Sequence, residues 1–243
     1  MKKKIAISLD SDILDKLNKV SNNRSKFIED LLRDNFNSTK TAVLLNGGSY
    51  EDNLVDGKLK CLVKYDGEYL IKKQVNMLLS YGYNDIKLIA SSSTYEKIIS
   101  ELGYSFVKNL DFIEDKTKKG SFSSLKNLDI DNDFLLVYGD VYFNYDLNRF
   151  YDFHNSHNVN SILSITSSSD TKKGEVVIDG NDVISFSQNE KSGSLIYSSS
   201  IFYFKSSVLN YSGNDIELDL IPKLVENNLL KTIILKGKRF HLE

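Results

Sequence analysis

The segment Phe134-Leu-Leu-Val-Tyr-Gly-Asp-Val-Tyr-Phe143 combines a short apolar run with polar residues directly behind it. The run Phe134–Val137 has the length of a strand, and its uniform apolarity is typical of a strand that is buried on both faces. Such strands belong to parallel sheets that are covered by helices. Because ligands of these sheets bind outside the carboxyl ends of the strands, Gly139 and Asp140 are the first candidates for a site.

The sequence before this segment alternates short apolar runs with amphipathic helical patterns. Strands are predicted over Ala42–Leu45 and Ile86–Ala90, and helices near Glu68–Tyr81 and Thr94–Leu102. This alternation is typical of βαβ units. It predicts an α/β domain with a mixed, mainly parallel sheet flanked by helices.

Further elements are predicted on both sides of the quoted segment. The pattern changes from βαβ units to a hairpin and an aromatic strand after residue 165, as expected of a mixed sheet. The remaining predictions are a helical segment Gly120–Leu128, a helix near Leu147–His157, a strand Ser161–Ile165, a hairpin of Gly174–Ile178 and Val183–Phe186, a strand Ile201–Phe204 and a helix Glu217–Asn227.

The composition is that of an ordinary globular protein. The chain has 243 residues, 41% of them hydrophobic, a formal net charge of −2 and one cysteine, Cys61. A single cysteine forms no disulfide framework, and no apolar run approaches the ~20 residues that cross a bilayer. We therefore expect a cytoplasmic protein without a membrane partner, with Cys61 in the core.

The charge is distributed unevenly. Residues 1–40 hold 9 basic and 6 acidic side chains, net +3, so the other residues hold 22 and 27, net −5, and the two sums give the total of −2. This asymmetry suggests a small basic module on an acidic body. The predicted domains are residues 1–37 and 41–243, joined by a polar linker over residues 38–40.

The first 37 residues predict one strand followed by two short helices. Residues 3–9 alternate apolar and polar side chains, and the helical segments each have one apolar face. The stretch KIAISLDSDILDKLNKVSNNRSKFIEDLLRDNF resembles a ribbon-helix-helix module, which implies a homodimer through residues 1–37 and possible binding of double-stranded DNA. The alternative is a module that only dimerises. The resemblance assigns DNA contacts to Lys4, Ala6, Ser8, Asn23, Arg24 and Ser25.

Two further groups of residues could form sites. Asn46-Gly47-Gly48 follows the first strand of the body, where glycines expose backbone N–H groups to a base or phosphate, although a tight turn is the simpler interpretation. Asp140 could hold Mg²⁺ together with phosphate oxygens, or it could cap a helix or turn. His154 and His157, three residues apart, are interpreted as surface histidines rather than as a metal pair.

The order of motifs in the body resembles the sugar-1-phosphate nucleotidyltransferases. The resemblance covers nearly all of residues 41–235. It rests on the stretches AVLLNGGS, KLKCLVKYDGEYLIKKQVNMLLSYGYNDIKLI, GSFSSLKNL, FLLVYGDVYF, GEVVIDGNDVISFSQNEKSG, SSIFYF and DIELDLIPKLVENNLL, which occur in this order.

This resemblance implies a reaction in which an NTP and a sugar 1-phosphate give a nucleotide sugar and pyrophosphate. It implies that Asp140 holds Mg²⁺ and that Lys60 meets the charge on the α-phosphoryl group. The implied nucleotide-binding residues are Asn46, Gly47, Gly48 and Gly120, and the implied sugar-binding residues are Glu190 and Lys191.

Two departures from the family pattern leave a second function open. Ser49–Asn53 is acidic where the family has a phosphate-binding arginine, and KGKRFHLE contains no match for a second metal aspartate. Like charges near a triphosphate weaken its binding. The alternative is a DNA-binding regulator in which a degenerate nucleotidyltransferase domain senses a nucleotide or sugar nucleotide.

Overall fold

The computed structural model consists of two compact units, residues 1–39 and residues 40–243. It describes residues 6–21, 23–29, 40–116, 119–165, 174–188 and 194–242. Within these ranges no helix has the length and apolarity that a bilayer-spanning segment requires.

The first unit contains two short helices, as predicted. Helix α1 spans Ser11–Val20 with Asp10 at its N-cap, and residues 24–29 form the second helix. The Asn23 side chain caps this second helix by accepting the backbone N–H of Lys26 at 3.0 Å. Residues 6–10 are not in a strand of the single chain. Since a strand exists only beside another strand, the predicted ribbon requires a second chain. Lys4, one of the predicted DNA contacts, lies outside the described residues.

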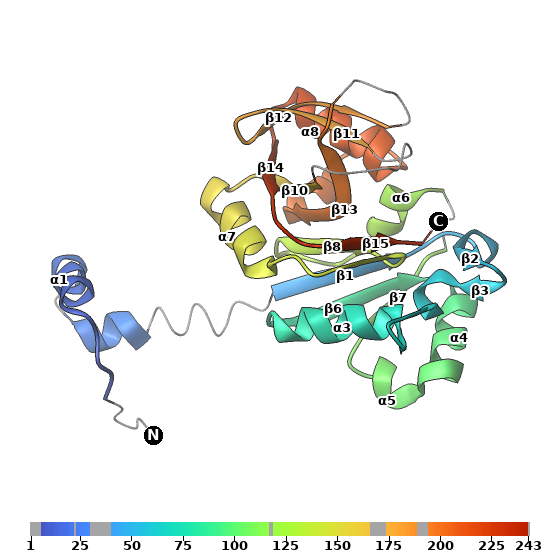
Figure 1. The fold of residues 1–243 in the computed structure, drawn as a ribbon, viewed down its shortest axis with the longest axis horizontal. Coiled ribbons are helices and arrows are strands. Elements are labelled where there is room, and N and C mark those ends of the chain that lie inside the picture. The colour runs from blue at the N-terminus through green and yellow to red at the C-terminus, as the bar shows by residue number, and fades with distance from the viewer. Residues whose placement is uncertain are drawn as a thin grey trace. The chain divides into compact units, whose positions relative to one another are not determined.

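The second unit is built on a nine-stranded sheet with the order β10-β14-β12-β11-β13-β8-β1-β6-β7 (Figure 1). Strand β1 (Lys40–Asn46) pairs in parallel with β6 (Tyr83–Ala90) and β8 (Phe134–Tyr138), and β6 pairs in parallel with β7 (Asp111–Glu114). The parallel sheet predicted from the apolar runs is therefore present in this half.

The other half of the sheet closes into a five-stranded barrel. Its strands are β10 (Asn160–Ile165), β11 (Glu175–Asp179), β12 (Asp182–Ser187), β13 (Tyr197–Phe204) and β14 (Leu230–Ile234). Closure arises because β13 pairs antiparallel with β10 as well as with β11 and β8. The hairpin predicted for this half is present, but the closure of the strands into a barrel was not predicted. The hairpin β11–β12 brings antiparallel pairing into the sheet, and closure leaves fewer strand edges exposed.

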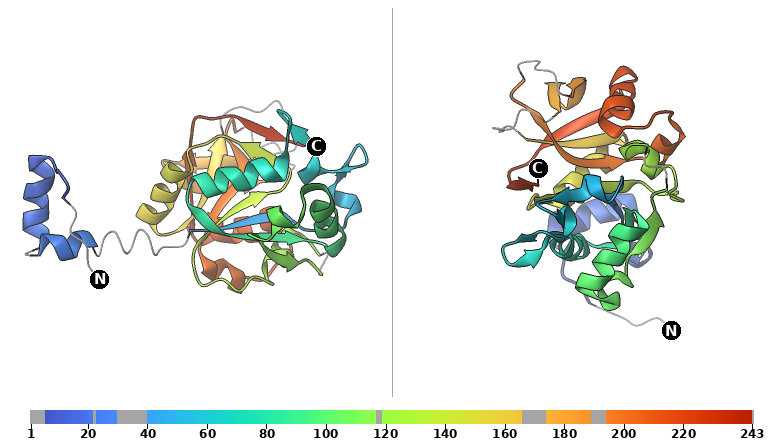
Figure 2. Two further views of the ribbon diagram at one scale, coloured as in Figure 1. Left: turned by 90° about the horizontal axis from the view of Figure 1, so that it is seen from below. Right: turned by 90° about the vertical axis from the view of Figure 1, so that its right-hand side faces the viewer.

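Helices cover both faces of the sheet (Figure 1, Figure 2). In β1, Ala42 and Leu44 pack in one hydrophobic cluster, whereas Val43 and Leu45 pack in the other. This alternation explains why the strand reads as a continuous apolar run. One cluster includes α3 (Leu70–Ser80), α4 (Ser92–Leu102), α5 (Tyr104–Val107) and α7 (Leu147–His157), and the other α6 (Ser121–Leu125), η4 (Ile216–Leu220) and α8 (Ile221–Glu226).

The shortest elements were not predicted from the sequence. Three or fewer residues carry too little hydrophobic pattern to be recognised, and the five residues of β14 are of mixed polarity. These short elements are η1 (Glu51–Asn53), β2 (Leu54–Val55), β3 (Lys58–Leu59), η2 (Lys60–Leu62), β4 (Lys64–Tyr65), β5 (Glu68–Tyr69), β9 (Val141–Phe143) and β15 (Arg239–His241). Strand β7 and the 3-10 helix η3 (Ser206–Asn210) were also missed.

The prediction that His154 lies on the surface is wrong. Its side chain is 1% exposed, and Nε2 lies 3.0 Å from Oδ2 of Asp133. Nδ1 lies 3.4 Å from the hydroxyl of Ser161. This serine–histidine–aspartate row is structural, because both the serine and the histidine are fully buried. His157 instead contacts the carbonyl of Phe153 at 2.8 Å, so the two histidines do not form a metal pair.

We expect Asp133→Ala to reduce the free energy of unfolding by about 1–3 kcal/mol at pH 7, because the buried imidazole loses its acceptor. Burial opposes ionisation of Asp133, but the hydrogen bond to His154 and the charge of Lys205 hold its pKa below the ordinary value. The contribution is therefore present above the unfolded pKa near 3.8 and is lost as pH falls through the lower folded value. Urea unfolding at several pH values measures the effect. Equal losses in the exposed control Asp131→Ala would contradict it.

Candidate functional site

Lys60 and Asp140 lie side by side although they are far apart in the sequence. Lys60 is the first residue of η2, and Asp140 lies in the turn between β8 and β9. Lys60 Nζ is 3.6 Å from Asp140 Oδ2, with side-chain exposures of 24% and 22%. The two groups that the sequence analysis assigned to one ligand are therefore close enough to share it.

His241 is a third member of this group and was missed from the sequence. Strand β15 pairs antiparallel with β9 so that His241 stands opposite Val141, directly after Asp140. Its Nε2 lies 3.4 Å from Asp140 Oδ2. In KGKRFHLE only a carboxylate was expected as a further cation ligand, and the three residues of β15 carry too little pattern to predict the strand with which they pair. We call Lys60, Asp140 and His241 the Asp140 site.

The environment of Asp140 favours its charged form. Burial alone would raise its pKa, but the hydrogen bond from His241 and the charges of His241 and Lys60 hold it below the ordinary value. The second oxygen, Oδ1, is buried and has no hydrogen-bond partner among the described residues. A buried carboxylate oxygen without a partner is unfavourable unless a ligand or cation satisfies it. Asp140 therefore fits a role as a ligand of a divalent cation.

The turn that carries Asp140 is held by the side chain of Gln74. This fully buried residue of α3 donates from Nε2 to the carbonyls of Tyr138 at 2.9 Å and Val141 at 2.6 Å. These carbonyls flank Gly139 and Asp140. A Cβ atom at Gly139 would lie 1.9 Å from Oδ1 of Asn46. The end of β1 therefore packs directly on the turn, which explains the glycine and places Asn46 beside the Asp140 site.

The Gly47-Gly48 loop is occupied by protein groups. A Cβ atom at Gly47 would lie 2.7 Å from Oδ2 of Asp115 and 2.8 Å from the hydroxyl of Ser124. Gly48, with φ +91°, donates its N–H to the same Asp115 oxygen at 2.8 Å. Asp115, directly after β7, thus makes the close approach that was predicted for a base or phosphate. No sequence motif marked this residue.

The packing of the fold also explains the glycine at position 120. It has φ +128°, and a Cβ atom there would lie 2.7 Å from the carbonyl oxygen of Asn214. That carbonyl accepts the N–H groups of Phe122 and Ser123 at the start of α6. Gly120 therefore allows α6 to pack on the segment before η4. Its predicted contact with a nucleotide stays a prediction.

The pKa of Glu217, a residue of η4, is raised. Burial, followed by the charges of Asp215 and Asp140, raises the pKa of Glu217 from 4.5 to about 7, while the charge of Arg239 opposes this. Arg239 donates from Nε to the Ser199 carbonyl at 2.8 Å and lies 3.3 Å from the Ser200 hydroxyl. Neither Glu217 nor Arg239 was predicted. Glu190 and Lys191, the predicted sugar-binding residues, lie outside the described residues.

Cys61, next to Lys60, is a core residue. It is 2% exposed, and burial raises its pKa to about 12, so the thiol stays protonated. The expected packing role is confirmed.

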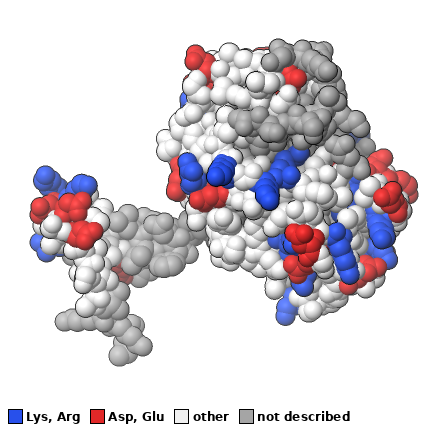
Figure 3. All heavy atoms as spheres, in the orientation of Figure 1, with Lys and Arg blue, Asp and Glu red and all other residues white. Residues whose placement is uncertain are grey.

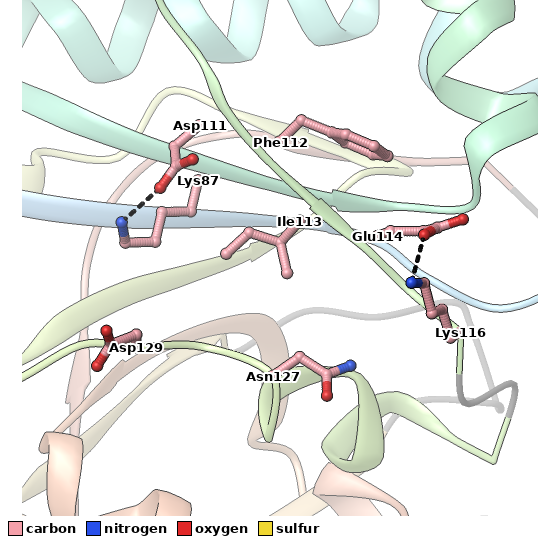
Figure 4. A pocket seen from close by; sticks show the side chains of 8 residues that line it. All are labelled: Lys87, Asp111, Phe112, Ile113, Glu114, Lys116, Asn127 and Asp129. Atoms are coloured by element: carbon pink, nitrogen blue, oxygen red, sulfur yellow. Dashed lines mark hydrogen bonds and ion pairs between the residues drawn. The ribbon is translucent and has the colours of Figure 1, made fainter.

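A separate hollow of about 470 Å³ lies at the edge strand β7 (Figure 4). Two ion pairs, Lys87–Asp111 at 2.9 Å and Lys116–Glu114 at 3.1 Å, line it. These charges neutralise each other, whereas Asp140 keeps an unsatisfied buried oxygen. On the face drawn in Figure 3, basic and acidic side chains of the described residues are intermixed. We therefore regard the Asp140 site as the candidate functional site.

Comparisons with known proteins support the fold. Over 125 residues, 49% of this chain and 35% of the other, it is 29% identical to a Sulfolobus acidocaldarius protein named "Putative mannose-1-phosphate guanyltransferase". The chain thus spans about a third of that relative. No family model matches.

Two solved structures resemble the chain. A Bacillus anthracis protein described as a "Putative Glucose-1-Phosphate Thymidylyltransferase", solved in complex with a sucrose, has a TM-score of 0.71 at 16% identity and covers 83% of this chain and 89% of its own. HddC from Yersinia pseudotuberculosis has a TM-score of 0.67 at 19% identity, with coverages of 84% and 93%. The body therefore has a fold like that of sugar-phosphate nucleotidyltransferases.

We expect Glu217→Gln to stabilise the protein at pH 8 in metal-free buffer, raising Tm by about 2–4 °C. Because the folded pKa near 7 lies above the unfolded value, the native state binds the extra proton, and stability falls as pH rises through this window. The gain of the variant should disappear near pH 4–5. Thermal unfolding from pH 4 to 8 measures it. A Tm difference that does not change with pH would contradict the raised pKa.

Proposed function

We propose that the body transfers a nucleotidyl group from an NTP to a sugar 1-phosphate and releases pyrophosphate. The observation that carries the proposal is the contact between Lys60 and Asp140, 3.6 Å apart, at the carboxyl end of the central strand β8. The similarity in fold and the relative named as a guanyltransferase support the same reaction class.

The reaction joins two anions, so it depends mainly on positioning and on neutralisation of charge. A phosphate oxygen of the sugar phosphate attacks the α-phosphorus, a new P–O bond forms, and the bond to the β-phosphate oxygen breaks. The Lys60 ammonium is suited to the negative charge that gathers on the α-phosphoryl oxygens. The predicted contact of Gly47 and Gly48 with the nucleotide is not part of this proposal, because Asp115 makes the close approach to that loop.

Asp140 would hold Mg²⁺ together with phosphate oxygens of the substrates. Its unsatisfied buried oxygen and its favoured charged form fit this role. A bound Mg²⁺ supplies charge neutralisation for the triphosphate. Among the described residues, His241 rather than a second carboxylate lies beside Asp140, with its Nε2 3.4 Å from Oδ2. Fewer carboxylates weaken cation affinity, so we expect a requirement for millimolar Mg²⁺.

Asp140→Asn should reduce pyrophosphate release at least about 100-fold, because the variant keeps the shape of the side chain but loses its charge. The assay contains Mg²⁺, each of the four NTPs, and mannose 1-phosphate or glucose 1-phosphate. Lys60→Met should lower kcat by a similar factor.

The matched control for these variants is Asp66→Asn, in the β4–β5 turn, which should leave turnover unchanged. If the wild-type protein releases no pyrophosphate with any pair of substrates, the proposed reaction is wrong. Full activity of Asp140→Asn would also contradict it.

A second proposal concerns residues 1–37, which would form a homodimer by pairing with a second copy. The carrying observation is the exposure of apolar side chains in this unit: Ile7 is 54% exposed, Ile13 46% and Val20 67%. Helix α1 contributes no buried residue. The described residues 6–21 and 23–29 form no buried core, and a second copy would cover their apolar side chains.

DNA binding by this dimer remains the alternative function. Ala6, Ser8, Arg24 and Ser25 are exposed, and Asn23 caps the helix at which the resemblance places the DNA backbone. A mobility shift of the DNA upstream of the coding sequence at moderate salt, in a protein that releases no pyrophosphate, would favour a regulator over an enzyme.

Ile13→Asp should convert a dimer of the full chain into a monomer, because burying an unpaired carboxylate in the contact costs several kcal/mol. Sedimentation equilibrium of the full chain at micromolar concentration measures the mass. The control Asp15→Asn changes an exposed residue of the same helix and should stay dimeric. A monomeric wild-type protein would contradict the proposal.

A further inference from the structure

The three members of the Asp140 site come from two separate segments of the body. Lys60 opens η2, which leads into the hairpin of β4 and β5. Asp140 and His241 lie at one end of the two-stranded sheet of β9 and β15, which the chain reaches on its way from β14 (Figure 1). The ion pair of Lys60 with Asp140 spans 3.6 Å and is partly exposed, so it contributes little to holding the two segments together.

The small sheet of β9 and β15 has two different faces. His241 stands opposite Val141, and Phe240 stands opposite Tyr142. Because successive side chains of a strand point to opposite faces, His241 lies on one face, and Tyr142 and Phe240 lie on the other. The first face contacts the site, since His241 Nε2 lies 3.4 Å from Asp140 Oδ2. The second face presents two half-buried aromatic side chains.

Tyr65 of β4 covers this second face. Its ring centroid lies 4.5 Å from that of Phe240, with 30° between the ring planes, and 5.2 Å from that of Tyr142. Lys73 of α3 places its ammonium group 5.4 Å from the centroids of both tyrosine rings. Stacked rings with a cation over their faces attract one another beyond the area that they bury. We call Tyr65, Tyr142 and Phe240 the aromatic clamp.

Strand β15 depends on contacts of this kind. It has three residues and pairs with β9 in a two-stranded sheet, and a sheet of this size is marginal by itself. Tyr65, in contrast, belongs to a segment that the core holds in place. Cys61 and Leu62 of η2 are buried, and the Val63 carbonyl accepts the N–H of Leu70 in α3 at 2.9 Å. The aromatic clamp therefore attaches a marginal strand to a firmly held segment.

A second stacked pair shows what aromatic packing alone provides. The ring of Tyr95 in α4 lies on that of Phe112 in β7, with centroids 3.9 Å apart and 5° between the planes. This pair joins two elements that carry no member of the Asp140 site. The aromatic clamp differs because Phe240 is the neighbour of His241 in β15. Its location, rather than its packing, points to a role in the site.

We propose that Tyr65 is a positioning residue of the nucleotidyl transfer. By stacking on Phe240, it keeps β15 in place. His241 then stays against Asp140 and orients the carboxylate opposite Lys60. A carboxylate whose orientation is not fixed loses part of the rate gained from positioning. The inference rests on the proposed function and deepens it, because it assigns the geometry of that site to a ring outside it.

Steady-state kinetics of the full chain test the proposal. Tyr65→Ala should lower kcat about tenfold or more, because the site loses its fixed geometry. Tyr65→Phe keeps the ring and should restore kcat to within about twofold of the wild type. The control Tyr95→Ala removes a comparable ring, so it should lower Tm by a similar amount and leave kcat unchanged. Equal losses of kcat in Tyr65→Ala and Tyr95→Ala, or no loss in Tyr65→Ala, would overturn the proposal.

A double-mutant cycle shows whether Tyr65 acts through His241. His241→Ala should also lower kcat. Adding Tyr65→Ala to it should cost no more than about a further twofold, since both changes remove the same contact with Asp140. If the two losses multiply, Tyr65 acts on the reaction by another route and the proposal is wrong.

Limited proteolysis separates this inference from the proposed reaction. Trypsin cleaves after Arg239 when β15 opens away from β9, because a paired strand does not enter a protease site. Tyr65→Ala should be cleaved there at least about fivefold faster than the wild type, and Tyr95→Ala at the wild-type rate, as measured by mass spectrometry. This result in a protein that releases no pyrophosphate would support the aromatic clamp and contradict only the transfer reaction. If Tyr65→Ala is cleaved as slowly as the wild type, the aromatic clamp does not hold β15, and the inference fails whatever the activity.

Discussion

The turn that carries Asp140 is held from three sides, and the candidate site depends on it. Gln74 of α3 donates two hydrogen bonds to the carbonyls that flank the turn. The end of β1 packs on Gly139, and β15 pairs with β9 immediately after Asp140. These contacts come from segments far apart in the chain. They fix a charged carboxylate beside Lys60, and its second oxygen has no hydrogen-bond partner among the described residues.

The carboxylates of the body fall into two classes: those that are satisfied by hydrogen bonds, and those whose burial is not compensated by a partner and therefore reduces stability. Asp133 and Asp215 are satisfied by hydrogen bonds, and their carboxylates support neighbouring elements. Asp140 keeps one buried oxygen without a hydrogen-bond partner among the described residues, and burial raises the pKa of Glu217. Such groups lower stability unless a ligand meets them. Their concentration around the end of β8, rather than at the ion-paired hollow beside β7, is the physical argument for the location of the site.

The sequence predicted much of the fold because most elements are long enough to show a period. Strand β8 and helix α7 lie where their apolar patterns placed them. The closed barrel was not predictable, because the second pairing of β13 depends on contacts with β10 that have no local signal. For the same reason His241 was missed. The strand β15 has only three residues, and His241 comes close to Asp140 only because β15 pairs with β9.

The sequence by itself determined the α/β class of the body, the candidate Asp140 and a small N-terminal unit with two amphipathic helices. These conclusions follow from periodicity and residue type, which are local properties, whereas the candidate Lys60 came from the resemblance in motif order. Only the tertiary structure decided that Asp115 contacts the glycine loop, that His241 lies beside Asp140, and that Glu217 is buried enough for its pKa to rise. Each of these depends on which side chains meet across the sheet, and long-range packing settles that.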